Sequence, residues 1–309
     1  MCIVGRKLSM KPIIVLSNAE QQCATFFWKE NPQFYVGYRF IEHEPDVLPT
    51  PLPGIDLLPA ALAVVPPTSD KPALSGKDGD PWNNDWKVRH VDDHSGSGTQ
   101  LSFATFSDGA ALCRSAGNVS GQIREFFFEP VDDGVCLWMK LTSRAAIMGA
   151  FCVQQCLRFT GSSNVEWRRR VALVPFLSEF DIQARGKPLE TITFARRGNQ
   201  WLRFPLSHTR YHTAPGFALV AGKSEGEVDH GLIVRESLDS KYCSGMYWER
   251  TAYISNRHPA DCVHASVDLG PLDPGGSRLA RGKVYFITGT KDDLLELWKK
   301  DFPLCRQIT

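Results

Sequence analysis

The stretch QIREFFFEPVDDGVCLWMKL, residues 122–141, contains two short apolar runs on either side of Asp132-Asp133-Gly134. Aromatic and apolar residues dominate both runs, whereas aspartate and glycine are turn-forming residues. This pattern is typical of consecutive β-strands. We therefore expect strands over 122–129 and 135–141.

The same pattern continues on both sides of this stretch. Further short apolar or alternating runs lie at 86–91, 101–106, 151–160, 165–176, 192–196, 201–204, 217–221, 231–234, 246–253, 262–269 and 282–289. Glycine, proline, aspartate or serine separates most of them. So many strands without helical patterns between them favour an antiparallel sandwich over a wound α/β fold. The expected fold class is all-β, a large antiparallel β-sandwich of the supersandwich kind.

Two helices are expected at the ends of the chain. Asn18 is a suitable cap for a short N-terminal helix over 19–29, with Cys23, Phe26 and Phe27 on one face. Thr290 and Asp293 have the spacing of a capping box before an apolar stripe, which predicts a C-terminal helix closing against a sheet.

The chain divides into three parts by composition. Residues 1–44 form an N-terminal strand and helix segment that we expect to pack on the main domain. Residues 45–81 contain nine prolines, which exclude ordinary helix or central strand; a surface arm, a lid or a subunit contact is expected there. Residues 82–309 form the β-sandwich domain with its C-terminal helix.

Composition excludes several classes of protein. The 309 residues are 43% hydrophobic and carry a formal net charge of +1, which argues against a general nucleic-acid binder. No apolar stretch approaches the roughly 20 residues of a membrane span. The nine cysteines show no metal spacing, so we interpret them as reduced, mostly buried thiols in a cytoplasmic protein. Secretion stays open if a signal peptide has been removed, and no cofactor or metal is expected.

The densest cluster of proton-handling side chains lies at 205–216. On a strand His208, Arg210 and His212 would point together, with Tyr211 opposed. Two imidazoles and a guanidinium can act as acid, base and charge stabiliser in one cleft. Hydrogen-bonded histidines at a sheet edge are the purely structural alternative. A metal site on His208 and His212 is a rival that the adjacent arginine disfavours.

Two neighbouring segments carry candidate ligand-binding groups. On a strand over 151–160, Gln154 and Arg158 share a face of otherwise small residues, which suits the floor of a polar cleft. Trp167 and Arg168 follow, and residues 158–210 hold nine arginines and one lysine against four acidic residues. Guanidinium groups bind carboxylates bidentately and indoles stack on sugar rings. Ordinary ion pairs on a solvated face are the alternative explanation.

Later residues could complete the site. Tyr247 and Glu249 share one strand face and Trp248 lies on the other, while His264 lies near the start of a further strand. A carboxylate among arginines and aromatic residues is a natural acid or base, so Glu249 is the expected one.

A long run of short strands, with histidines and a late glutamate beside sugar-binding residue types, resembles the galactose-mutarotase-like supersandwich proteins at fold level, over about 82–289. That group includes sugar epimerases and domains of glycoside hydrolases and polysaccharide lyases. The His-x-x-x-Asn-Leu element of its epimerases does not occur after His208.

The leading hypothesis is therefore an enzyme that acts on a carbohydrate, expected to be an acidic sugar or oligosaccharide, by general acid/base chemistry of the lyase or hydrolase type. Arg158, Arg168 and Arg210 would neutralise the carboxylate, Tyr211 or a histidine would move the proton, and Glu249 would assist. Alternatives are a sugar epimerase or mutarotase, a non-catalytic carbohydrate-binding sandwich, and a metal-dependent cupin-like enzyme. An oligomer could form through the proline-rich arm.

Overall fold

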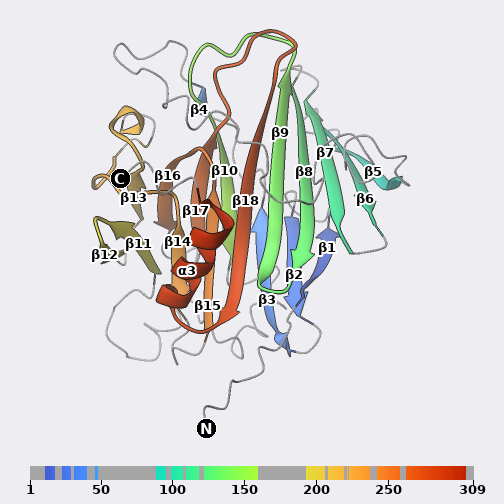
Figure 1. Cartoon of the computed structure of the whole chain (residues 1–309). Helices are drawn as coiled ribbons and strands as arrows, with labels where there is room; N and C mark the ends of the chain where they lie inside the picture. Colours follow the sequence, from blue (N-terminus) through green and yellow to red (C-terminus); the bar gives the residue numbers. More distant parts are fainter. Residues whose placement is uncertain are drawn as a thin grey trace.

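The computed structural model describes residues 11–17, 23–28, 31–39, 46–47, 88–94, 99–106, 109–117, 122–158, 193–205, 208–218, 221, 223–236, 242–257 and 262–303. Within them the chain forms two large antiparallel sheets and a C-terminal helix (Figure 1). The helix α3 spans Lys291–Asp301. None of the described helices is both long and apolar enough to cross a membrane.

The first sheet has eight strands in the order β1-β2-β3-β10-β17-β16-β13, with β4 also paired to β10. Its strands are β1 (Ile13–Ser17), β2 (Cys23–Trp28), β3 (Asn31–Arg39), β4 (Asp46–Val47), β10 (Phe151–Arg158), β13 (Thr209–His212), β16 (Thr251–Arg257) and β17 (Cys262–Asp268).

The second sheet has ten strands in the order β12-β11-β14-β15-β18-β9-β8-β7-β6-β5. Its strands are β5 (Val88–His94), β6 (Thr99–Thr105), β7 (Ala111–Gly117), β8 (Gln122–Val131), β9 (Gly134–Ser143), β11 (Thr193–Arg197), β12 (Gln200–Arg203), β14 (Ile233–Glu236), β15 (Tyr242–Trp248) and β18 (Ser277–Thr288).

The stretch at 122–141 forms the β8–β9 hairpin near the centre of the ten-stranded sheet. The register runs from Gln122 opposite Ser143 to Val131 opposite Gly134. Gly134 has a φ of +148°, and a Cβ there would lie 1.9 Å from the carbonyl oxygen of Val284 on the next strand. Only glycine therefore allows β18 to approach the turn this closely.

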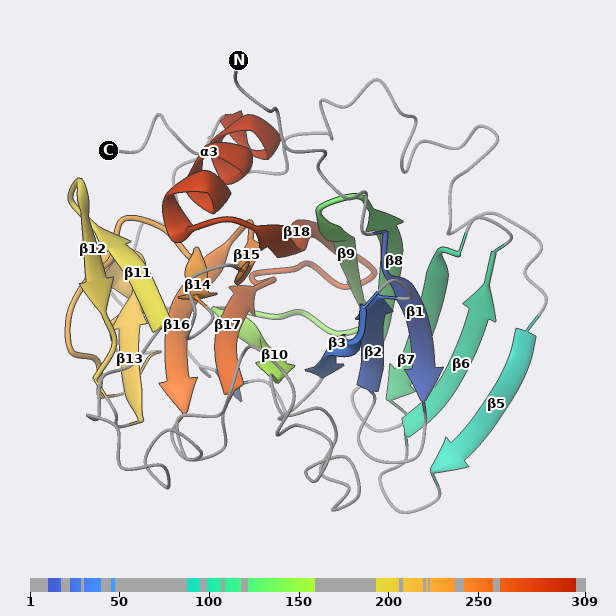
Figure 2. The same ribbon diagram turned by 90° about the horizontal axis from the view of Figure 1, so that it is seen from below.

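The two sheets pack face to face over one apolar core (Figure 2). Phe26 and Tyr38 of the eight-stranded sheet contact Phe128 of the other, each with ring centroids 6.2 Å apart. The Trp248 indole donates to the Tyr38 hydroxyl at 3.1 Å, and that hydroxyl donates to Gln155 at 2.7 Å. We call the faces that meet here the inner faces and the opposite faces the outer faces.

The expected N-terminal helix is wrong where the structure can test it. Residues 23–28 form strand β2, while 18–22 and 29–30 lie outside the described residues. Ala24 and Phe26 are both fully buried, which is the alternation of a strand. The spacing of Cys23, Phe26 and Phe27 suited a helix locally, but pairing with β1 and β3 buries more of the aromatic surface.

Two expected strands also differ. In the expected strand at 217–221, Phe217 ends a 3-10 turn, Pro215–Phe217, and Ala218 and Ala221 belong to no strand, while 219–220 lie outside the described residues. The run at 246–253 is divided at Arg250, whose φ of +63° turns the chain from β15 in one sheet to β16 in the other. Residues 165–176 and most of the proline-rich part lie outside the described residues, apart from β4.

The C-terminal helix is confirmed. The Thr290 hydroxyl accepts from the Asp293 amide, and the Asp293 carboxylate accepts from the Thr290 amide, which completes the predicted capping box. Leu294, Leu295 and Trp298 pack with Tyr247 in a second cluster on the outer face of the ten-stranded sheet, where Figure 1 shows α3 in front of β14 and β15.

Candidate functional site

Strand β13 determines on which face of the eight-stranded sheet the side chains of Arg210, Tyr211 and His212 lie. It pairs with β16 so that Arg210 lies opposite Ser255 and His212 opposite Tyr253. Tyr211 is buried, whereas Arg210 and His212 are half-buried. Alternation therefore puts Arg210 and His212 on the outer face and Tyr211 on the inner face. His208 precedes the strand and is exposed.

A second segment, residues 224–229, lies along the free edge of β13. The His212 amide donates to Gly226 at 3.1 Å, and the Val228 amide donates to His212 at 2.9 Å. These bonds make His212 and Glu227 partners in a parallel bridge. Bridge partners point to the same side, so the imidazole and the carboxylate are neighbours across a strand spacing of about 5 Å.

The hydrogen bonds of Ser224 fix the His212 ring. Its Oγ lies 2.8 Å from His212 Nδ1 and accepts from the Gly226 amide at 3.2 Å. The hydroxyl has one hydrogen, and the carbonyls of Gly226 and Arg210 are both placed to accept it, at 3.1 and 3.4 Å. We infer that Nδ1–H donates to Ser224, which leaves the lone pair of His212 on Nε2.

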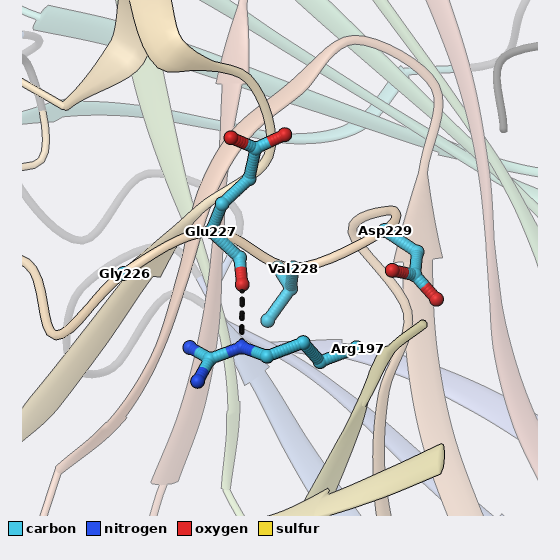
Figure 3. Close-up of a pocket in the computed structure, with 5 residues that line it drawn as sticks. All are labelled: Arg197, Gly226, Glu227, Val228 and Asp229. Carbon is cyan, nitrogen blue, oxygen red and sulfur yellow. Dashed lines mark hydrogen bonds between the residues drawn. The ribbon is translucent and has the colours of Figure 1, made fainter. Parts of the chain in front are cut away.

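An open pocket of about 460 Å³ lies beside this edge (Figure 3), and its lining residues are Arg197, Gly226, Glu227, Val228 and Asp229. Arg197 Nε donates to the Glu227 carbonyl at 2.8 Å. In Figure 3 the Glu227 carboxylate and the Val228 side chain point to opposite sides of the segment.

Hydrogen bonds from the end of β11 hold the pocket's other wall. The Gly198 amide donates to Asp229 Oδ1 at 2.6 Å, and the Asp229 amide donates to Arg196 at 3.0 Å. The pocket thus has a fixed frame with Arg197 and Asp229 in its lining, and the Glu227 carboxylate points away from Arg197 (Figure 3). That mixture of donors and acceptors suits a ligand rich in hydroxyl groups.

Tyr211 is placed as part of the core. Its ring meets Phe204 edge-on at 5.0 Å, and the Arg197 guanidinium lies 5.1 Å from its centroid. Burial raises the pKa of Tyr211 above its ordinary value, although Arg197 opposes the shift. A phenol in this setting is a poor base at neutral pH.

The other expected residues of the eight-stranded sheet are on the outer face. Gln154, Ser266, Tyr253 and His212 are successive register partners across β10, β17, β16 and β13, and we call them the His212 row. Cys156, His264, Ser255 and Arg210 form the next row, the His264 row. Two rows therefore bring four predicted residues, Gln154, His264, Arg210 and His212, to one face.

Arg210 is held in place on this face. Its Nη1 donates to the Ala221 carbonyl at 3.0 Å, and its guanidinium carbon lies 5.6 Å from the Tyr253 ring centroid. The backbone of Arg158 continues β10 in a third row, opposite Cys262. The Arg158 side chain, Trp167 and Arg168 lie outside the described residues.

The residues expected from 247–249 are not brought to β13. Trp248 belongs to the inner core at 1% exposure, and Tyr247 packs under α3. The Glu249 carboxylate accepts from Arg281 Nη2 at 2.9 Å, and Arg281 belongs to β18 of the other sheet. Burial raises the pKa of Glu249 above its ordinary value, and the positive charge of Arg281 offsets part of this rise. This pair anchors the β15–β16 connection.

Sequence reasoning missed Glu227, Asp229 and Arg197. The alternation of acidic residues in Glu225-Gly-Glu-Val-Asp229 was a visible signal for an extended segment with one polar side. What the sequence does not contain is the parallel bridge that places this segment against His212, because that contact depends on the loop between them.

No protein-family model matches the chain, and comparison with curated proteins gives no match. Solved structures with a similar arrangement include a candidate aldose 1-epimerase from Escherichia coli K12, at 12% identity and TM-score 0.33, over 68% of this chain and 71% of that one. A galactose mutarotase-like protein from Clostridium acetobutylicum matches at 10% identity and TM-score 0.30, over 67% of each chain.

An α-N-acetylgalactosaminidase from Bifidobacterium bifidum matches at 9% identity and TM-score 0.36, over 96% of this chain and 38% of the enzyme. The structural neighbours are thus mutarotase-like proteins and domains of glycoside hydrolases.

Proposed function

We propose that the protein is a carbohydrate-active enzyme that transfers protons at the anomeric centre of an uncharged sugar, with His212 as the base and Glu227 as its charged partner. The observation that carries this proposal is the parallel bridge between His212 and Glu227. It pairs a half-exposed imidazole with an exposed carboxylate beside a pocket whose volume suits one or two sugar rings.

The local charge favours a neutral sugar over an acidic one. Among the described residues that line the pocket, Glu227 and Asp229 are acidic and Arg197 alone is basic, so a uronate carboxylate would meet net repulsion. Arg210 is already engaged by the Ala221 carbonyl and the Tyr253 ring. Elimination on a uronate, the chemistry expected from sequence, would depend on Arg158 and Arg168 instead.

The proposed chemistry uses the free lone pair of His212. Nε2 takes the proton of the anomeric hydroxyl, the bond from the anomeric carbon to the ring oxygen breaks, and solvent protonates that oxygen. The imidazolium formed in this step lies beside the Glu227 carboxylate, which stabilises its positive charge. Reversal from either face of the open-chain aldehyde exchanges the two anomers. The same pair could activate water in glycoside hydrolysis.

The test combines activity and binding on separate substrates. Anomer exchange of glucose, galactose and N-acetylgalactosamine would be followed by NMR, nitrophenyl glycosides would report hydrolysis, and uronate oligosaccharides would report elimination. We expect His212→Gln and Glu227→Gln to lower turnover by about 100-fold or more, with sugar affinity within about threefold of wild type. The exposed His208→Gln and Glu296→Gln are the matched controls.

Each alternative predicts a different result. Sugar binding without any turnover would identify a non-catalytic binding protein. Turnover restricted to uronate oligosaccharides would support the lyase. If His212→Gln turns over as fast as the control, the proposed base is wrong.

A further inference from the structure

The outer face of the eight-stranded sheet contains a buried cluster of two thiols and an imidazole. Cys156 of β10 lies directly opposite His264 of β17, and Cys262 is two residues before His264 on the same strand face. Cys156 and Cys262 are fully buried and His264 is 1% exposed. Neither cysteine is part of a disulfide.

The potential ligand atoms converge. One such atom from each residue lies within 4.8 Å of the other two, and Cys262 Sγ is 3.2 Å from His264 Nε2. Two ligands at about 2.1 and 2.3 Å from a tetrahedral zinc ion are themselves separated by about 3.6 Å. Small side-chain rotations would therefore bring all three ligand atoms onto one ion.

Ser255 supplies the hydrogen-bond partner that a metal-binding histidine needs at its other ring nitrogen. Its Oγ lies 3.1 Å from His264 Nδ1, on the ring edge away from Cys262. A histidine that binds metal through one nitrogen normally donates the other N–H to an oxygen, which fixes its tautomer and orientation. Ser255 lies next to His264 in the His264 row, so the sheet itself sets this contact.

We propose that Cys156, Cys262 and His264 bind one Zn²⁺ ion. Binding releases two protons, one from each thiol, and the two thiolates with a neutral imidazole balance the charge of the cation. Thiolate and imidazole donors favour zinc over magnesium or calcium, which prefer oxygen.

Three protein ligands leave the fourth position of the ion for a water or another ligand. The zinc site is independent of the proposed acid/base pair, because His212 and Glu227 contribute no ligand to it.

Zinc content and cobalt spectroscopy of the full chain test this inference. We expect one zinc per chain in native mass spectrometry of protein supplied with Zn²⁺. Co²⁺ added to metal-free, reduced protein should give the intense thiolate-to-cobalt charge-transfer band and the visible bands of tetrahedral cobalt. Cys156→Ala, Cys262→Ala and His264→Gln should weaken binding by more than about 100-fold, since loss of an outer partner alone costs 10–100-fold.

Two further variants complete the design. Ser255→Ala should weaken zinc binding by about 10- to 100-fold while it preserves the thiolate band. Cys113→Ala removes another fully buried cysteine and should leave the stoichiometry at one. If the ligand variants do not fold, the cobalt spectrum of wild type still decides. Absence of its thiolate band, a disulfide between Cys156 and Cys262, or equal binding by Cys262→Ala and Cys113→Ala would overturn the proposal.

Discussion

Acidification from pH 7 to pH 4 should destabilise the protein by about 3 kcal/mol through His230 alone. The His230 ring lies against Trp298 of α3, with centroids 4.1 Å apart and planes at 31°. Its Nδ1 accepts from the Leu232 amide at 3.4 Å, so the neutral tautomer carries its hydrogen on Nε2. Protonation at Nδ1 would remove this acceptor and place a charge beneath the helix.

The magnitude follows from the pKa of the folded protein. Burial lowers the pKa of His230 to about 4, and the positive charges of Arg196 and Lys299 add to the effect. In the unfolded chain the pKa is about 6.5. Because the folded pKa is the lower one, the neutral ring stabilises the fold fully above pH 6.5, and this stability is lost as the pH falls through 4. Linkage gives about half of the loss by pH 5.5 and about 3 kcal/mol at pH 4.

Urea unfolding of wild type and His230→Asn at pH 7, 5.5 and 4 isolates this contribution. Asparagine keeps an oxygen for the Leu232 amide but does not titrate. The stability of wild type relative to the variant should fall by about 3 kcal/mol across the range. NMR titration of the ring in folded protein provides a direct check. His230 does not have the lowered pKa if the difference stays constant within about 0.5 kcal/mol, or if the ring titrates near 6.5.

Two substitutions in β18 test the packing on either face of the ten-stranded sheet. Gly282→Ala would put a Cβ 2.5 Å from the Trp248 ring and should lower the free energy of unfolding in urea by about 3 kcal/mol. The control Gly275→Ala has nothing within 4 Å of its Cβ but a φ of +77°, so it should lower that free energy by about 1 kcal/mol. Equal losses in the two variants would contradict a clash at Gly282. The Lys283 ammonium lies 2.7 Å from the carboxylates of two aspartates and is 6% exposed, so Lys283→Met should cost about 2 kcal/mol. Lys299→Met, which removes a more exposed pair in α3, should change stability by less than about 0.5 kcal/mol, and a similar loss in both variants would exclude a special role for Lys283.

Local sequence determined the elements whose contacts are local. The capping box at Thr290 and Asp293 needs only a three-residue spacing, and the structure contains it. The β8–β9 hairpin depends on a turn within its own stretch. Strand β2 shows the opposite case, because Phe26 packs against Phe128 of the other sheet, which is distant in sequence. Local periodicity could not distinguish helix from strand there.

The candidate site shows the same division. Alternation correctly predicted that Arg210 and His212 share a face that Tyr211 does not. The prediction that Glu249 belongs to this site did not take account of the turn at Arg250, which places β15 and β16 in different sheets. Glu227 could be found only from the bridge that joins it to His212, and no pattern within either segment specifies that bridge.

The outer face of the eight-stranded sheet has a composition that folding alone does not favour. Every residue of β17 is buried, so this strand is covered on both faces, and strands of that kind are normally apolar throughout. Its outer face instead carries His264, Ser266 and Asp268, each of which must lose hydration on folding. The Asp268 carboxylate recovers part of that cost by accepting from the amides of Phe151 and Gly270. The Ser266 hydroxyl recovers none from the described residues. These three buried polar side chains of β17, one of them without a hydrogen-bond partner among the described residues, are therefore better explained by a ligand than by stability. If Ser266→Ala stabilises the protein and changes neither zinc binding nor sugar turnover, that explanation is wrong for Ser266.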